Sequence, residues 1–195
     1  MKDDMRKDEE IMMEYRAGNI GALEEIFQRY KKPILNYAFK LLSSFADAED
    51  VVGEVFYILT SSKDKYEPRA KFNTWIYTIA HNVAIDRIRK RRKISFFWQK
   101  KDKENNSYEE LDIPDTRFMP DANAEENDVA SYVKKAIDKL PFQLKEAIVL
   151  RQYHNLTYEE IGVVLNCSLS KVKILIFRAK ETLRKELWPY MEEVR

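Results

Sequence analysis

The sequence is poor in the residues that interrupt helices or cross-link a chain. Among its 195 residues are four glycines, six prolines and one cysteine. Few glycines and prolines favour helix over sheet, because these two residues disfavour a helix interior most. The single cysteine, Cys167, excludes an internal disulfide and cannot form a cysteine metal cluster by itself. We therefore expect an all-α chain that forms one domain or two small ones.

Long apolar runs are absent as well. No run approaches the roughly 20 residues that span a bilayer, and the first ten residues, MKDDMRKDEE, are too charged for a signal peptide. This predicts a cytoplasmic protein without direct membrane insertion. The two histidines, His81 and His154, leave no metal-ligand spacing, and His81 fits the polar face of a helix better than a metal site. No catalytic constellation or glycine-rich phosphate loop is visible, so we expect a non-enzyme that needs no cofactor.

The net charge of +1 conceals a strong segregation of charge along the chain. Residues 87–101 carry eight basic side chains and no acidic one, whereas residues 102–128 carry ten acidic and two basic ones. Residues 129–195 are basic again, with twelve basic and eight acidic side chains. Two basic blocks on either side of an acidic connector predict two anion-binding modules on a tether.

The first basic block ends a strongly patterned stretch, Phe72 to Lys93, with the sequence FNTWIYTIAHNVAIDRIRKRRK. Its apolar residues recur at the spacing of one helix face. A buried aromatic face that leads into a cationic end suits a helix that presents polar and stackable groups to nucleic acid. An ordinary amphipathic helix with a solvated basic end explains these residues equally well.

Three further helices are expected before this stretch, at about 9–17, 19–42 and 45–59. Gly18 and Asn19 separate the first two, as a C-cap and the next N-cap, and Pro33 predicts a kink in the second. The third helix, FADAEDVVGEVFYIL, has more apolar surface than one stripe needs. Part of that surface could face a partner, and a mostly buried central helix is the alternative.

Residues 96–127 contain the acidic run and two prolines and show no sustained periodicity, which predicts a flexible linker between domains at 1–95 and 128–195. Phe96, Phe97 and Trp98 are unusual in a linker, and either pack on the first domain or meet a partner.

The second domain reads as four helices that include a helix-turn-helix. Thr157 and Glu160 have the spacing of a capping box, and the helix they open ends near Asn166. A short turn leads to a helix that buries Leu169, Val172 and Ile176 and turns lysine and arginine outward. This order is typical of a DNA-binding unit, and a structural pair of antiparallel helices is the alternative.

The order of these motifs resembles the sigma-70 family of bacterial transcription initiation factors, and within it the small two-domain extracytoplasmic-function (ECF, group 4) branch. DAEDVVGEVFYIL at 47–59 is similar to the family's helix for docking on RNA polymerase core. Residues 71–93 are similar to its promoter-melting helix, and residues 140–183 to its helix-turn-helix for the upstream promoter element. The resemblance covers nearly the whole chain and implies a sigma factor that directs core polymerase to specific promoters and helps open the DNA.

The resemblance also implies partners and contact residues. The partners are the clamp helices of the largest polymerase subunit, the flap of the second-largest subunit, promoter DNA, and an anti-sigma factor, for which 174–177 and 96–98 are candidate contacts. The residues implied for core binding are Asp47, Asp50, Val51, Glu54, Val55 and Phe56. Those implied for the −10 element, with loop 61–71 and Asn82 holding a flipped base, are Lys71, Asn73, Trp75, Tyr77, Asn82, Arg87, Arg89, Lys90, Arg91 and Arg92. Trp75 also fits the apolar stripe, and for this residue a purely core role is the favoured alternative. Those implied for the −35 element are Ser168, Ser170, Lys171, Lys173 and Arg178.

One departure from the family pattern concerns the helix implied to read the −35 element. Where the family usually has a serine and an arginine, this chain has Ile174 and Leu175. A cationic contact is lost and apolar surface is gained, which changes the expected sequence preference.

Two other functions compete with this prediction. A stand-alone helix-turn-helix regulator explains residues 140–183 and leaves the first domain unexplained. A DNA-modifying enzyme needs a nucleophile or a set of metal-binding carboxylates that the sequence does not show.

Overall fold

The structure, a computed structural model, describes residues 6–67, 71–102 and 128–193, and for 92–102, 128–130, 189 and 191–193 the backbone alone. The elements over these ranges are eight α-helices and one short 3-10 helix, η1, which confirms the all-α prediction. The chain divides into two compact units, Met1–Phe118 and Met119–Arg195. Among the described helices, none combines the length and the apolar character that crossing a bilayer requires.

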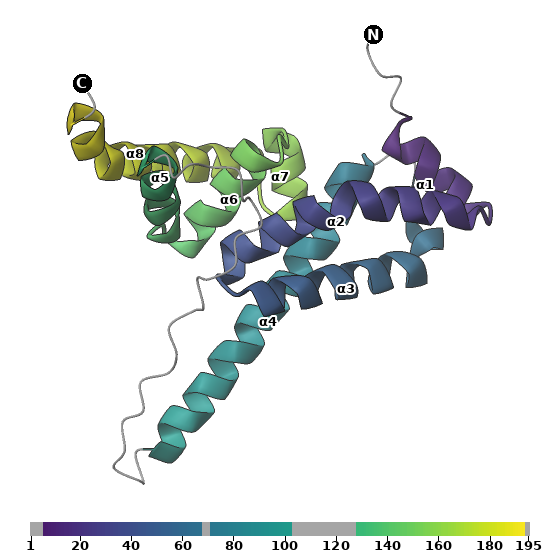
Figure 1. The fold of residues 1–195 in the computed structure, drawn as a ribbon, viewed down its shortest axis with the longest axis horizontal. Coiled ribbons are helices and arrows are strands. Elements are labelled where there is room, and N and C mark those ends of the chain that lie inside the picture. The colour runs from purple at the N-terminus through teal and green to yellow at the C-terminus, as the bar shows by residue number, and fades with distance from the viewer. Residues whose placement is uncertain (1–5, 68–70, 103–127, 194–195) are drawn as a thin grey trace. The chain divides into compact units, whose positions relative to one another are not determined.

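Four helices pack together in the first unit, with α2 against α1, α3 and α4 (Figure 1). The boundary between α1 and α2 follows the predicted sequence signals. Gly18 has a φ of +102° after α1, and the Asn19 side chain accepts a hydrogen bond from the backbone N–H of Gly21 at 3.1 Å. Ser44 caps α3 in the same way through the N–H of Asp47 at 3.3 Å. The elements are α1 (Asp8–Arg16), α2 (Ile20–Leu42), α3 (Phe45–Ser61), η1 (Lys63–Lys65) and α4 (Phe72–Asp102).

Helix α2 runs unbroken through Pro33, so this proline does not end it, and the predicted kink stays a prediction. Its buried face has the spacing of one helix side: Ile26, Tyr30, Ile34 and Tyr37 recur every three or four residues and are buried.

Helix α4 is longer than the sequence predicts. Its first half buries an apolar face that includes Phe72, Ile76 and Val83, and its last turns run on beyond α2 and α3 (Figure 1). The predicted end at Lys93 is wrong, because the helix continues to Asp102 through a stretch without glycine or proline. The prediction of a linker at 96–127 is likewise wrong for residues 96–102, which belong to α4. The side chains of Phe96, Phe97 and Trp98 and the rest of the predicted linker, 103–127, lie outside the described residues.

The second unit is the predicted four-helix arrangement. Helix α8 packs against α5, α6 and α7, and its buried residues include Val172, Ile176 and Ala179. The capping box at the start of α7 is confirmed, since the Thr157 N–H donates to Glu160 Oε2 at 2.7 Å and the Glu160 N–H donates to Thr157 Oγ1 at 3.2 Å. The helices are α5 (Asp128–Asp138), α6 (Phe142–Tyr153), α7 (Tyr158–Val164) and α8 (Leu169–Glu193).

The turn between α7 and α8 folds back tightly on α7 at Gly162. The Cys167 N–H donates to the Gly162 carbonyl at 2.9 Å, and Asn166 takes a left-handed φ of +48°. A Cβ at position 162 would lie 3.0 Å from the carbonyl oxygen of Cys167. The backbone of the turn approaches this closely because residue 162 has no side chain.

Gly162→Ala is therefore expected to destabilise the second unit by about 1–3 kcal/mol, since the added methyl group must displace backbone. Hydrogen exchange read on α7 and α8 peptides measures this loss. Gly53→Ala is a matched control in α3, where an added Cβ meets nothing within 4 Å. It should raise the protection of α3 through helix propensity, by up to about 1 kcal/mol. Equal effects from the two substitutions would contradict the close approach at Gly162.

Candidate partner and nucleic-acid surfaces

Helix α3 turns its aliphatic residues inward. Val51 and Val55 are fully buried and Phe56 is nearly so, with the Phe56 ring edge-on to Phe27 of α2 at 4.8 Å between centroids. The prediction that these three side chains contact a partner is wrong for the structure, because α2 and α4 already cover that side of α3. The alternative of a mostly buried helix face is confirmed.

The outer side of α3 carries Asp50, Glu54 and Tyr57, at positions i, i+4 and i+7 of one face. Tyr57 is 72% exposed, which makes it the large apolar group that α3 presents to solvent. Tyr57 was not among the predicted contact residues, because the apolar surplus of this helix had not been divided between its faces. Its spacing from the two carboxylates was the available signal.

Arg87 of α4 crosses to these carboxylates. Its Nη1 lies 2.9 Å from Asp50 Oδ2 and 3.6 Å from Asp47 Oδ1, and its Nη2 lies 3.7 Å from Glu54 Oε2. The Arg87 side chain is 24% exposed. Arg91, one turn further along α4, also pairs with Asp47 and lies 3.5 Å from the carbonyl oxygen of Leu42.

This network corrects the prediction that Arg87 belongs to a row of phosphate-binding cations. Its guanidinium points across the α3–α4 contact, not toward solvent, because α4 places residues 87 and 91 on the side that faces α3. Arg89 and Lys90 stay exposed, and the side chain of Arg92 lies outside the described residues.

A second face of α4 brings together Trp75, Asn82 and Arg89. These residues are seven positions apart, so each lies only about 20° around the helix from the one before it. Asn82 and Arg89 are exposed. Trp75 is half-buried, with its ring 5.2 Å from Tyr66 and 5.9 Å from Phe72 between centroids. The structure therefore aligns an aromatic ring, an amide and a guanidinium along one edge.

Two further residues predicted for the −10 element, besides Arg87 and Arg91, also lie off this face. Tyr77 is 2% exposed, and its ring packs edge-on against Tyr37 at 5.5 Å. Because the ring is buried, the prediction that it supports a DNA strand is wrong for the structure. The same burial raises the pKa of the Tyr77 hydroxyl. Asn73 is half-buried and lies about half a turn away from Asn82 around the helix. Lys71 is exposed and precedes the first turn.

His81 neighbours Asn82 and faces the core. Its Nδ1 lies 3.3 Å from the hydroxyl of Tyr37. Burial lowers the pKa of the imidazole to about 4, and the nearby charge of Arg89 acts in the same direction. The ring is therefore neutral at physiological pH.

The residues predicted to contact the −35 element lie along the exposed side of α8 and at its start. Ser170, Lys171, Lys173 and Arg178 are all exposed. Ser168 has a structural role as well, because its Oγ accepts a hydrogen bond from the N–H of Lys171 at 3.3 Å. The structure thus brings together the five predicted residues, which come from one helix and its cap.

The apolar segment 174–177 divides between two faces of α8. Leu175 and Ile176 are buried, whereas Ile174 and Phe177 are 52% and 66% exposed. Leu169 is a further correction, because it was predicted to be buried and is partly exposed at the first turn.

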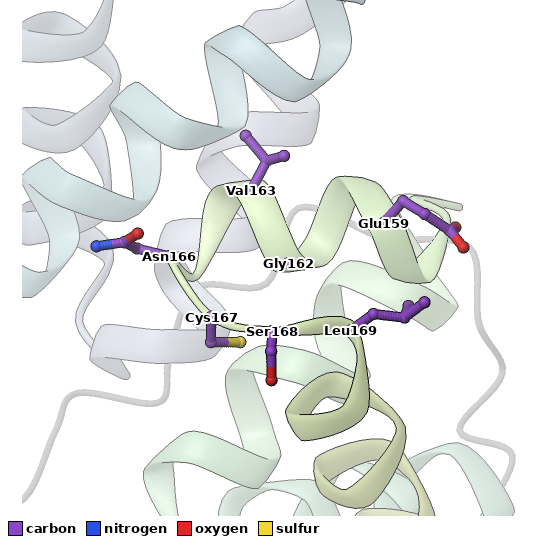
Figure 2. A pocket seen from close by; sticks show the side chains of 7 residues that line it. All are labelled: Glu159, Gly162, Val163, Asn166, Cys167, Ser168 and Leu169. Atoms are coloured by element: carbon purple, nitrogen blue, oxygen red, sulfur yellow. The ribbon is translucent and has the colours of Figure 1, made fainter.

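An open hollow follows the turn of the helix-turn-helix (Figure 2). Its lining includes Ser168 and Leu169, with Glu159 as its one charged member. Over the described ranges, no cluster of three or more His, Cys, Asp or Glu side chains could hold a metal ion. The lining residues are Glu159, Gly162, Val163, Asn166, Cys167, Ser168 and Leu169.

Comparisons with known proteins agree with this arrangement. The profile of Sigma-70 region 2 matches residues 26–94, and that of Sigma-70, region 4 matches residues 131–183. The chain is similar to the ECF RNA polymerase sigma factor SigW of Bacillus subtilis, with 31% identity over 88% of this chain and 92% of that protein. It is also similar to the RNA polymerase sigma-H factor of Pseudomonas aeruginosa, with 26% identity over 96% and 97% of the two chains.

The chain belongs to the ECF sigma factors. It is thus a promoter-specific transcription initiation factor that works with RNA polymerase and promoter DNA. The region 2 match covers α3 and most of α4, and the region 4 match covers the helix-turn-helix.

Solved structures share the fold of this sigma factor. The sigma factor RpoE of Bartonella quintana, in complex with the anti-sigma factor NepR, gives a TM-score of 0.67 at 21% identity, over 84% of this chain and 95% of that chain. CnrH, in complex with the cytosolic domain of CnrY, gives a TM-score of 0.65 at 21% identity, over 92% and 96% of the two chains.

Arg87→Ala is expected to lower the free energy of unfolding by about 1–2 kcal/mol, because it leaves three carboxylates of α3 without their shared cation. Urea denaturation followed by circular dichroism measures this change. Arg89→Ala is the matched control, since Arg89 is exposed and pairs with Asp86 of its own helix at 3.4 Å. It should change stability by less than about 0.5 kcal/mol. A larger loss for Arg89→Ala than for Arg87→Ala would contradict the network.

A second prediction concerns Glu146 of α6, which is buried. Burial raises the pKa of this carboxyl to about 7, while the charge of Lys171 on α8 lowers it. Because the folded state holds this proton more firmly than the unfolded state, stability should be greatest below about pH 4.5 and fall as the pH rises through 7.

Glu146→Gln removes this ionisation. The variant should be more stable than the natural chain by about 1–3 kcal/mol at about pH 8 and closely similar at about pH 5. Exchange protection of α6 and α8, corrected for the intrinsic pH dependence of exchange, gives the comparison. A gain of equal size at both pH values would show that ionisation is not its cause.

Proposed function

We propose that the outer face of α3 is the surface of this sigma factor that docks on RNA polymerase core, on the clamp helices of the largest subunit. Asp50, Glu54 and Tyr57 share that face, and Tyr57 adds the apolar contact that the buried Val51, Val55 and Phe56 cannot supply. The Asp50 side chain is 63% exposed although it pairs with Arg87. Arg87 holds the carboxylates in place from behind, and Asp47 belongs to this support because its side chain is largely covered.

The proposed −10 surface is the edge of α4 formed by Trp75, Asn82 and Arg89, with Lys71 and Lys90 beside it. Unstacking a base costs a few kcal/mol, and stacking on an aromatic group returns about 1–3 kcal/mol per base. Binding therefore opens the duplex without a nucleotide-driven motor. We assign Asn82, which is exposed between an aromatic and a cationic neighbour on the same edge, to hydrogen-bonding a flipped base.

The proposed −35 reader is α8, through Ser168, Ser170, Lys171, Lys173 and Arg178. Their exposure on one helix matches the recognition helix of a helix-turn-helix, whose first turns contact base edges in the major groove. The flap of the second-largest subunit is the polymerase partner proposed for this unit.

Regulation by an anti-sigma factor, a cytoplasmic location and the lack of any enzymatic activity complete the proposal. The complexes of RpoE with NepR and of CnrH with CnrY, which share the fold, support the first of these.

Promoter-specific transcription by purified core polymerase should depend on added sigma factor, and single substitutions should separate its surfaces. Glu54→Gln removes a charge from the docking face and should weaken core binding by about 3- to 10-fold. Glu49→Gln is the matched control, because Glu49 is exposed at another edge of the same helix. It should keep core affinity within about twofold.

Asn82→Ala separates the next step in the same assay. It should leave core binding within about twofold and lower the permanganate reactivity of the −10 thymines by about fivefold or more, since a flipped base loses its partner. Equal losses from Glu49→Gln and Glu54→Gln would contradict the docking face. Loss of core binding by Asn82→Ala would contradict its assignment to DNA.

A further inference from the structure

We propose that Ile174, with Phe177 beside it, reads the methyl groups of thymines in the major groove of the upstream promoter element. The inference rests on the proposed function of α8 as the −35 reader and goes beyond it, because it assigns a base preference to an apolar side chain.

The first observation is the orientation of these side chains. Val172, Leu175, Ile176 and Ala179 are buried and form the side of α8 that packs in the unit. Ser170, Ile174 and Phe177 follow one another at i, i+4 and i+7. At about 100° per residue, these three residues lie within about 60° of one another around the helix. The centre of the group lies opposite the buried side. Two large apolar groups therefore point directly away from the core.

The second observation is the charge on either side of this stripe. Lys173 and Lys180 are exposed along one flank, and Lys171 and Arg178 along the other. From Leu169 to Lys180 the helix carries these four cations and no acidic residue. The next residue on the stripe is Glu181, which pairs with Arg184 at 3.3 Å.

This layout matches the cross-section of a major groove. The groove is about 12 Å wide and is bordered on both sides by phosphates, so a helix lying in it meets phosphates at its flanks and base edges at its centre. The two rows of cations suit the flanks. A protein partner for the stripe would have to be acidic on both sides of an apolar centre, whereas duplex DNA carries phosphates on both sides of its major groove along its whole length. We therefore assign the stripe to DNA.

The chemistry of the centre then selects the base. An isoleucine side chain can neither donate nor accept a hydrogen bond, so it gains nothing from the polar edges of guanine, cytosine or adenine. The apolar group that a base pair presents in the major groove is the C5 methyl of thymine. Contact with it removes apolar surface from water on both partners. Ile174 lies one turn from Ser170 and in the first half of α8, where a recognition helix contacts bases.

The test begins with holoenzyme assembled from core polymerase and the full chain. This holoenzyme is used to select, by binding, from promoter duplexes whose upstream element is randomised. Thymine should be enriched at one or two positions of that element. At each enriched position thymine is then replaced by uracil, which removes the methyl group alone. The natural chain should bind the uracil duplex about fivefold more weakly, equivalent to about 1 kcal/mol.

Ile174→Ala should reduce that fivefold ratio to about one, because the methyl group then has no partner. Ile174→Val keeps branched methyl groups and should preserve most of the ratio. Lys173→Ala is the control for the flank. It should weaken the thymine and uracil duplexes by the same factor and lower the salt dependence of both.

The outcomes distinguish the assignment of α8 to the −35 element from the role of Ile174 within it. If the holoenzyme enriches no upstream sequence, the assignment of α8 to the −35 element fails. If a sequence is enriched but the natural chain and Ile174→Ala give the same thymine-to-uracil ratio, α8 reads DNA and the role of Ile174 is wrong. In that case the stripe is left as a surface for a protein partner. Because Ile174 is half exposed, its variants should fold, which circular dichroism verifies.

Discussion

The contact between α3 and α4 determines what the first unit can present to other molecules. Each helix buries its apolar side within the unit, and Arg87 closes the contact at its edge by reaching three carboxylates of α3. Burial of one side leaves the other side exposed, so the same packing that stabilises the unit also selects the residues available to partners. Asp50 and Tyr57 are exposed because Val51 and Val55 are not.

In the second unit, too, the packing of one side of a helix determines which side chains are exposed on the other. Helix α8 is covered on one side by α5, α6 and α7, and its opposite side carries cations around an apolar centre. The position of α8 depends on the turn that precedes it, which requires a residue without a side chain at Gly162 and a serine cap at Ser168. Backbone geometry at the turn thus sets the direction in which the exposed side points.

Local patterns in the sequence predicted most of the fold. The periodicity of α2, the cap at Asn19 and the capping box of Thr157 and Glu160 each depend on residues within a few positions of one another, and all are found in the structure. The helix-turn-helix and its exposed cations were predicted for the same reason.

The errors concern properties that no local pattern contains. Arg87 meets Asp50 across 37 positions of sequence, and nothing within either segment indicates that the charges pair. Tyr77 fits both a polar-edge and a buried position until the location of Tyr37 is known. Helix α4 continues past its last predicted residue because propagation needs no further apolar contact once a helix has formed.

The seven-residue spacing of Trp75, Asn82 and Arg89 also sets a length scale. A helix rises about 1.5 Å per residue, so these positions are about 10.5 Å apart along α4. Stacked bases in one strand follow one another at about 3.4 Å. A strand that ran along this edge with stacked spacing would therefore pass about three bases between one of these side chains and the next. The spacing of the side chains along this edge therefore corresponds to a short run of stacked bases. The aromatic ring and the guanidinium lie at the two ends of the edge, and the amide lies at its middle.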